Sequence, residues 1–322
     1  MLQLIKNDFS KYKTNVPTNK VKLLFKAPLA FLGQKRNWIR YLPNLCSDNL
    51  LDNNSFGKYS NSTWVDMFGG SGLLSHNLKL LMPRANVIYN DFDGYTNYLT
   101  EESIQILLEI NSQIRVVLKK YEKYPKAIKL SDDDAQSIRT VIDAYYNYYG
   151  DKLYRRQVYS WIVFSAAMMD SIETIARKEK FWHRGRNGGV GSHFEKHIAN
   201  WRNYLKGVNI LKHVDFKILL DKYKNDKNVV LIADPPYLNT TQGDYKGGFN
   251  KEQFDYLIDN LRPPFIAFSS SKNELCNILK ERYPKAQIEN KNIFIARGKS
   301  GGAHQKVSDV KYTDQMIFCA GD

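Results

Sequence analysis

The segment that most constrains the fold is a strand, a glycine-rich turn and a helix in direct succession, written STWVDMFGGSGLLSHNLKLLM at 62–82. A short apolar run, ANVIYNDFD at 85–93, follows and ends in acidic residues. This change from a strand pattern to a helical pattern and back indicates a βαβ unit, in which the two strands are parallel. The sequence therefore predicts an α/β fold that opens with a parallel sheet.

A helical region then interrupts the strands. Apolar residues recur at helical spacing over 103–121, and Ser131 with Asp134 has the spacing of a capping box before a helix that continues to 149. The segment 155–178 reads as a further helix. We therefore predict a helical insertion at 95–207.

Strand patterns return after the insertion. They lie at 208–216, 228–237, 264–270, 292–297 and 314–321, with helical patterns at 251–261 and 273–283 between them. We predict a doubly wound, mostly parallel sheet whose two parts are 1–94 and 208–322. Residues 1–27 are polar and weakly patterned, and we expect them to form a flexible lead-in. In open sheets of this kind ligands bind beyond the carboxyl ends of the strands.

The charge balance favours a polyanionic partner. The chain has 47 Lys and Arg against 33 Asp and Glu, which gives a formal net charge of +14. A membrane is the poorer candidate, because the longest apolar run, 160–169, is too short to span a bilayer and the N-terminus lacks a signal-peptide pattern. Three scattered cysteines form neither a disulfide framework nor a paired metal motif. We expect a reduced, cytoplasmic protein that is monomeric in solution.

The tetrapeptide DPPY, Asp234 to Tyr237, ends one of the predicted strands. Proline has no N–H, so Asp234 and the Pro235 carbonyl form a cluster of hydrogen-bond acceptors, with Pro236 fixing the backbone. An amino group on a planar base donates to such a cluster, and the Tyr237 ring offers a face on which the base stacks. We predict that these residues are catalytic.

The glycine turn and the acid that follows it point to a nucleotide-containing cofactor. Glycine between a strand and a helix lets a ligand approach the backbone N–H groups. Asp91 lies at the spacing of a carboxylate that accepts hydrogen bonds from ribose hydroxyls. The pattern is not a complete G-x-G-x-x-G, and it leaves both a nicotinamide cofactor and S-adenosylmethionine open.

The order of these motifs resembles that of the amino-methyltransferases that use S-adenosylmethionine. PLAFLGQKRNW at 28–38 is similar to the aromatic-x-Gly-x-Lys motif of the Dam-like, alpha-group DNA N6-adenine methyltransferases, although the usual aromatic residue there is Trp. YTDQMIF at 312–318 is similar to the family's last strand. The resemblance implies a Rossmann-like methyltransferase fold with a helical target-recognition insertion. It also implies S-adenosylmethionine as cofactor, double-stranded DNA as partner and a role for Asp234 beside the cofactor.

The resemblance further implies a set of cofactor contacts. Phe31, Gly33 and Lys35 would line the methionine end, and Asp91 would hold the ribose. The glycine turn would comprise Asp66, Phe68, Gly69 and Gly72, and the adenine of the cofactor would be flanked by Asp215 and Phe216.

A basic stretch with interleaved aromatic residues lies at 177–212, and a second basic loop lies at 296–306. Lys and Arg bind phosphates, and Arg and Asn read base edges. We predict DNA contacts from Arg184, Arg186, Asn187, Lys196 and Lys299. His193 and His197 have no third ligand at suitable spacing, so we predict no metal site.

These patterns predict methyl transfer from S-adenosylmethionine to N6 of an adenine flipped out of DNA. Cytosine C5 chemistry is excluded because no Pro-Cys pair supplies a nucleophile. Cytosine N4, an RNA amine, a catalytically silent DNA-binding module and a nicotinamide oxidoreductase remain alternatives. The recognition sequence, and whether a cognate restriction endonuclease accompanies the enzyme, stay open.

Overall fold

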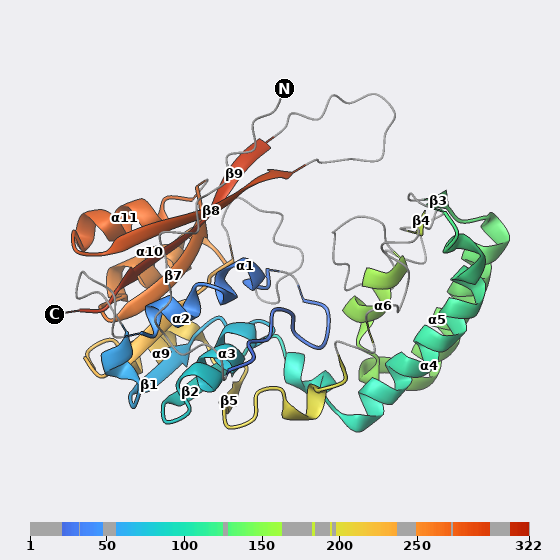
Figure 1. Cartoon of the computed structure of the whole chain (residues 1–322), viewed down its shortest axis with the longest axis horizontal. Helices are drawn as coiled ribbons and strands as arrows, with labels where there is room; N and C mark the ends of the chain where they lie inside the picture. Colours follow the sequence, from blue (N-terminus) through green and yellow to red (C-terminus); the bar gives the residue numbers. More distant parts are fainter. Residues whose placement is uncertain are drawn as a thin grey trace.

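A computed structural model describes the chain over residues 21–31, 33–47, 56–124, 128–162, 182–183, 194, 198–236, 249–271, 273–296 and 310–321. Within these residues a seven-stranded sheet forms the centre of the molecule (Figure 1). Its strands are β1 (Thr63–Asp66), β2 (Asn86–Asp91), β5 (Asn209–Lys212), β6 (Val229–Ala233), β7 (Phe265–Ser270), β8 (Gln287–Ala296) and β9 (Val310–Cys319).

The strand order is β5-β2-β1-β6-β7-β9-β8. The five strands from β5 to β7 run parallel, and β9 lies antiparallel between β7 and β8. The chain thus builds one half of the sheet outward from β1, returns to β6 beside β1, and builds the other half in the opposite direction. The predicted doubly wound, mostly parallel α/β fold is confirmed, and the arrangement is that of a Rossmann-like methyltransferase.

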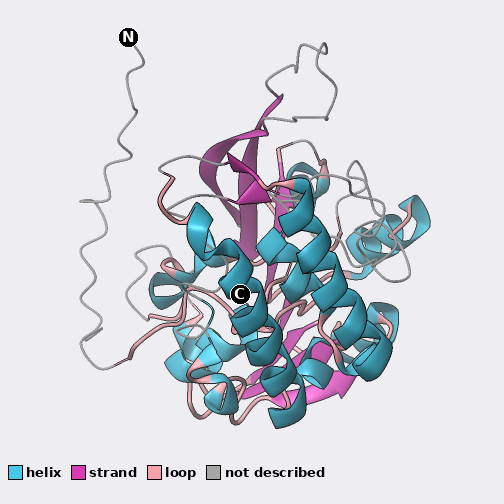
Figure 2. Ribbon diagram, turned by 90° about the vertical axis from the view of Figure 1, so that its right-hand side faces the viewer, coloured by secondary structure: helices cyan, strands magenta, loops and turns pink. Residues whose placement is uncertain are grey.

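Helices cover both faces of the sheet (Figures 1 and 2). Strand β6 is buried along its whole length, as expected for a central parallel strand with an apolar sequence. Val230 and Ile232 pack in one core with α3 (Leu73–Leu81) and the N-terminal helices α1 (Arg36–Ile39) and α2 (Leu42–Leu45). The alternate residues of β6 pack in the second core with α9 (Phe216–Tyr223), α10 (Lys251–Asn260) and α11 (Leu275–Arg282).

Three helices between β2 and β5 group together away from the sheet (Figure 1). They are α4 (Glu101–Leu118), α5 (Asp132–Tyr149) and α6 (Arg155–Ile162). The Thr100 and Ser131 hydroxyls accept from the N–H groups three residues on, so both are N-caps, as predicted for Ser131. The C-terminal part of the helix predicted over 155–178 lies outside the described residues, and the domain boundaries remain a prediction.

Shorter elements complete the described chain. The strands β3 (Ile128–Lys129) and β4 (Trp182–His183) pair antiparallel, and single 3-10 turns lie at η3 (Gly57–Tyr59), η4 (Tyr95–Tyr98), η5 (Lys119–Tyr121), η6 (Gly150–Lys152) and η8 (Trp201–Asn203). No helix in the described part of the chain is long and apolar enough to cross a membrane.

Two sequence predictions about local structure are wrong. The strand predicted over 208–216 ends at Lys212, because the Asp215 carboxylate accepts from the Lys217 N–H and caps α9. In the predicted flexible lead-in, the part from 21 to 27 is held in place. There the Leu24 backbone exchanges two hydrogen bonds of 2.8 Å with the Asn77 side chain on α3, and Ala27 is fully buried.

The N-terminal helix α1 is fixed on the sheet by Trp38. This side chain is fully buried, its ring centroid lies 5.9 Å from that of Phe268 on β7, and its indole N–H donates to the Asp314 carboxylate on β9 over 2.8 Å. Because Lys35 immediately precedes α1, the same contacts hold Lys35 over the end of the sheet.

We predict that Trp38→Phe lowers the free energy of unfolding by about 1–3 kcal/mol, because the partly buried Asp314 carboxylate loses a donor. Tyr148→Phe, at an 80% exposed position, is the control and should change stability by less than about 0.5 kcal/mol. Urea unfolding of the three proteins measures both values. Equal stabilities would contradict an anchoring role for Trp38.

Candidate active site

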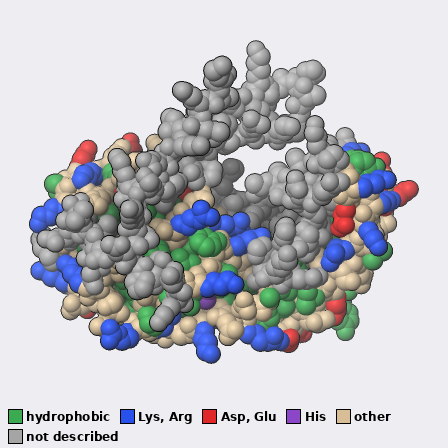
Figure 3. Space-filling view, viewed as in Figure 1, with side chains coloured by type: hydrophobic (Ala, Val, Ile, Leu, Met, Phe, Trp, Pro, Cys, Tyr) green, Lys and Arg blue, Asp and Glu red, His purple; other side chains and the backbone are tan. Residues whose placement is uncertain are grey.

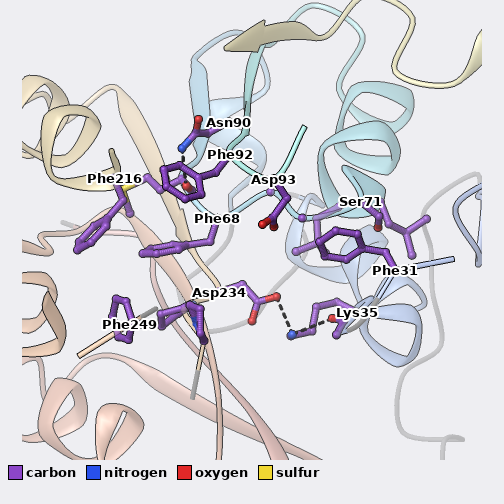
Figure 4. Close-up of a pocket in the computed structure, with 18 of the residues that line it drawn as sticks. Phe31, Lys35, Phe68, Ser71, Asn90, Phe92, Asp93, Phe216, Asp234 and Phe249 are labelled. Atoms are coloured by element: carbon purple, nitrogen blue, oxygen red, sulfur yellow. Dashed lines mark hydrogen bonds and ion pairs between the residues drawn. The ribbon is translucent and has the colours of Figure 1, made fainter. Parts of the chain in front are cut away.

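A pocket lies at the carboxyl end of the sheet beside β1 and β6, where the strand order reverses. This is the switch point at which open α/β sheets bind their ligands. The empty space, counted together with the open mouth, is about 1180 Å³. The pocket brings together segments from β1, β2, β6, the N-terminus and the start of α9 (Figure 4).

The predicted glycine turn forms one wall. Gly72 N–H donates to the Gly69 carbonyl over 2.7 Å, and Gly70 and Gly72 have φ angles of +52° and +73° that favour glycine. Gly69 is required for a different reason, because a Cβ there would lie 2.1 Å from the buried Tyr89 ring. The turn is therefore packed tightly on β2, and this fixes the backbone that faces the pocket.

An ion pair joins two of the predicted motifs across the pocket. Lys35 Nζ lies 2.6 Å from Asp234 Oδ2, and the two side chains are 9% and 17% exposed. The same ammonium donates to the Gly33 carbonyl over 3.0 Å. Burial raises the pKa of Asp234, and the Lys35 charge opposes this rise by favouring the carboxylate. Phe31, Gly33, Pro235 and Pro236 line the same pocket.

Asp66 does not line the pocket but lies behind it, 1% exposed. Its Oδ2 accepts from the Ser75 hydroxyl over 2.7 Å, whereas Oδ1 is buried with no hydrogen-bond partner. Burial raises the pKa of Asp66 to about 7, and the negative charge of Asp234 adds to this rise. The hydrogen bond from Ser75 and the positive charge of Lys35 oppose the rise. Asp66, Asp234 and Lys35 therefore interact electrostatically.

The two acids that follow β2 have different environments. Asp91 is fully buried, and its carboxylate accepts hydrogen bonds from the backbone N–H groups of Tyr95 and Thr96 over 2.7 and 2.9 Å and from the hydroxyls of Thr96 and Tyr89. Asp91 thus anchors η4, and it does not line the pocket. Asp93 lines it instead, and Figure 4 shows its carboxylate facing the space between Phe31, Phe68 and Asp234.

Three aromatic rings form the opposite end of the pocket. The centroids of Phe68 and Phe216 are 4.9 Å apart, and Phe249 lies 5.9 Å from the first and 5.8 Å from the second (Figure 4). Phe68 and Phe216 were predicted here, and Asp215 beside them also lines the pocket. Phe249 was missed, because it lies 12 residues after Tyr237 and belongs to no pattern in the sequence.

Several predicted residues lie outside the described residues. They are Tyr237 and the five predicted DNA contacts, Arg184, Arg186, Asn187, Lys196 and Lys299, together with His193 and His197. Among the residues that are described, no group of three or more His, Cys, Asp or Glu could hold a metal ion. The pocket lining also includes Asn90, Ser71 and Phe92, which the sequence did not single out.

The strand order and the pocket at its switch point define a Rossmann-like methyltransferase fold. No protein-family model matches the chain. The chain is 33% identical over 300 residues to a protein of Haemophilus influenzae (strain ATCC 51907 / DSM 11121 / KW20 / Rd) named "Putative methyltransferase", with 92% of this chain and 93% of the relative covered. The chain belongs to the methyltransferase family that this relative represents.

The environment of Asp66 predicts a pH dependence of stability. The carboxyl ionises near 3.8 when it is exposed and near 7 in the folded protein. Between these values the folded state holds a proton that the unfolded state has lost, so the contribution of Asp66 makes stability fall as pH rises from about 4 to 7. Above pH 7 this cost is complete.

Asp66→Asn removes the charge, so we predict that it stabilises the protein relative to wild type. The gain in the free energy of unfolding should grow from pH 4 to 7 and then level off at roughly a few kcal/mol. Urea unfolding at pH 4.5, 6 and 8 measures the difference. Asp143→Asn, at an exposed position, is the control. A difference that is the same at all three pH values would contradict the buried, protonated state.

Proposed function

We propose that this protein transfers a methyl group from S-adenosylmethionine to N6 of adenine in DNA, with the target base flipped into the pocket. The observation that carries the proposal is the acceptor cluster at the end of β6. There Asp234 and the prolines that follow it line the pocket at the switch point of the sheet, and Lys35 holds the Asp234 carboxylate. A pocket for the cofactor alone would not need this cluster.

The residues of the pocket fit S-adenosylmethionine. The Phe68, Phe216 and Phe249 rings supply an apolar surface for its adenine, and Asp93 supplies a carboxylate for ribose hydroxyls. The Phe31 side of the pocket, with Gly33 and the glycine turn, would hold the methionine end. When bound, this cofactor supplies an electrophilic methyl group on a sulfonium.

The acceptor cluster suits an exocyclic amine. The lone pair of such an amine is delocalised into the ring, so the amine is a poor nucleophile. Hydrogen bonds from its two N–H groups to Asp234 and to the Pro235 carbonyl would favour a tetrahedral nitrogen and aim it at the methyl group. Lys35 keeps Asp234 ionised and in place, and the reaction requires no covalent intermediate with the protein.

The charge of the chain supports a nucleic-acid substrate. The net charge is +14, and Figure 3 shows Lys and Arg side chains across the middle of one face, between the sheet and the α4–α6 helices. The predicted contacts Arg184, Arg186, Asn187 and Lys196 belong to the segment that follows α6 in the chain, and Lys299 belongs to the loop between β8 and β9. We propose that these residues bind the DNA duplex.

The nearest rival is methylation of cytosine N4, because the same acceptors would serve that amine. An RNA amine is a second rival. Purified protein incubated with tritiated cofactor and DNA should label N6-methyladenine, and an excess of unlabelled RNA should not compete. Label on N4-methylcytosine, or on RNA in preference to DNA, would contradict the substrate that we propose.

The Lys35–Asp234 pair predicts a change in the pH profile. An opposite charge at hydrogen-bond distance lowers a carboxyl pKa by about 1–3, so Lys35→Met should raise the pKa of Asp234. Since Asp234 must be ionised to accept from the amine, the acid limb of kcat/KM should move up by about one pH unit or more. Lys227→Met, on an exposed lysine, is the control and should keep the wild-type profile. A kcat/KM that falls by the same factor at every pH, with the acid limb at its wild-type position, would contradict this role.

The positions of the two acids after β2 predict different effects for the same substitution. Asp93→Asn should weaken binding of S-adenosylhomocysteine by roughly 10-fold or more, because a carboxylate acceptor is lost. Asp91→Asn should lower the free energy of unfolding by about 1–3 kcal/mol, because Asp91 holds the start of η4. Isothermal titration measures the change in binding, and urea unfolding measures the change in stability. A loss of binding in Asp91→Asn, with wild-type binding in Asp93→Asn, would show that Asp91 is the ribose ligand.

A further inference from the structure

The Phe31 wall of the pocket is held in place by residues that are distant in sequence. Ala30 and Phe31 lie outside the sheet, so their backbone has no strand partner. The Ala30 N–H donates to Gln157 Oε1 over 2.7 Å, and the Ala30 carbonyl accepts from the Tyr154 hydroxyl over 2.6 Å. Both hydrogen bonds are buried. The two partners are 127 and 124 residues away in sequence and lie at the start of α6.

The Phe31 side chain contacts the same part of α6. The Arg156 guanidinium lies 5.1 Å from the centroid of the Phe31 ring, and Arg156 and Gln157 are each only 7% exposed. Phe31 in turn contacts the glycine turn, since a Cβ on Gly70 would lie 2.9 Å from its ring. A continuous set of contacts therefore runs from α6 through Ala30 and Phe31 to the glycine turn.

The preceding residue is anchored separately. The Leu29 N–H donates to the Tyr95 hydroxyl over 2.9 Å, and this hydroxyl donates to the Leu29 carbonyl over 3.2 Å. The Tyr95 N–H in turn donates to the carboxylate of Asp91, the last residue of β2. Leu29 is therefore tied to the sheet through Tyr95, whereas Ala30 is hydrogen-bonded directly to residues at the start of α6. The Tyr95 ring also packs edge-to-face against Phe31 and Tyr154, with centroid distances of 5.7 and 6.0 Å, so a shift of α6 relative to the sheet would reach Phe31 through Tyr95 as well as through Ala30.

We propose that Tyr154 and Gln157 are positioning residues that set the place of Phe31 and so couple binding of the cofactor to binding of DNA by the helical insertion to which α6 belongs. This inference rests on the proposed function. Buried N–H and C=O groups are rarely left unpaired, so the two hydrogen bonds of Ala30 fix the backbone beside Phe31. Linkage then requires that DNA and cofactor strengthen each other by the same factor, which is about 5- to 150-fold in typical coupled sites.

The test measures the dissociation constant of S-adenosylhomocysteine by isothermal titration, with and without saturating unmethylated duplex DNA. For the wild type we expect DNA to tighten binding by about 5-fold or more. Gln157→Leu removes the acceptor, Tyr154→Phe removes the donor, and in each the ratio of the two constants should fall to within about twofold of unity. Gln157→Glu keeps an acceptor and should keep the wild-type ratio.

A matched control is Tyr98→Phe, which removes a hydroxyl from a ring packed 4.7 Å from that of Tyr154. A residue with a merely structural role would weaken binding equally with and without DNA, leaving the ratio unchanged. That result in Gln157→Leu and Tyr154→Phe would overturn the inference, as would a wild-type ratio of one. Tritium transfer to DNA by the wild type, measured in parallel, separates the two proposals, because its absence overturns the proposed function as well.

Discussion

The ion pair between Lys35 and Asp234 is the contact on which the rest of the pocket depends. It joins the N-terminal segment to the end of β6, two parts of the chain about two hundred residues apart. Two charges at low exposure are stable only when they are paired, so each residue fixes the other. Trp38 holds Lys35 from one side through Asp314, and the buried strand β6 holds Asp234 from the other.

This pair also explains why a carboxylate can act as an acceptor in a pocket that tends to protonate it. Burial favours the neutral acid at both Asp234 and Asp66, and the Lys35 ammonium opposes that tendency at both. Asp66, which lies further inside, has the pKa of about 7, while Lys35 lies directly against Asp234. The geometry thus divides the two acids into Asp66, which is buried behind the pocket, and Asp234, which lines it.

The sequence predicted the fold and the location of the pocket because both depend on short-range patterns. The strand, turn and helix at 62–82 and the order of the motifs determine where the carboxyl ends of β1 and β6 meet. The same patterns could not show which of Asp91 and Asp93 faces the pocket. That choice depends on the turn after β2, where the N–H groups of Tyr95 and Thr96 draw Asp91 inward. Nor could they show Phe249, or the contacts of Ala30 with Tyr154 and Gln157, because these depend on tertiary packing between distant segments.

We propose that this pocket methylates adenine N6 in DNA through Asp234. Long-read modification sequencing of DNA from cells that express the protein tests it most directly, because it reports the modified base and its context together. We expect N6-methyladenine in cells with the wild-type protein and none in cells with Asp234→Ala. Modification at cytosine N4, or unmodified DNA in cells that contain folded wild-type protein, would contradict it.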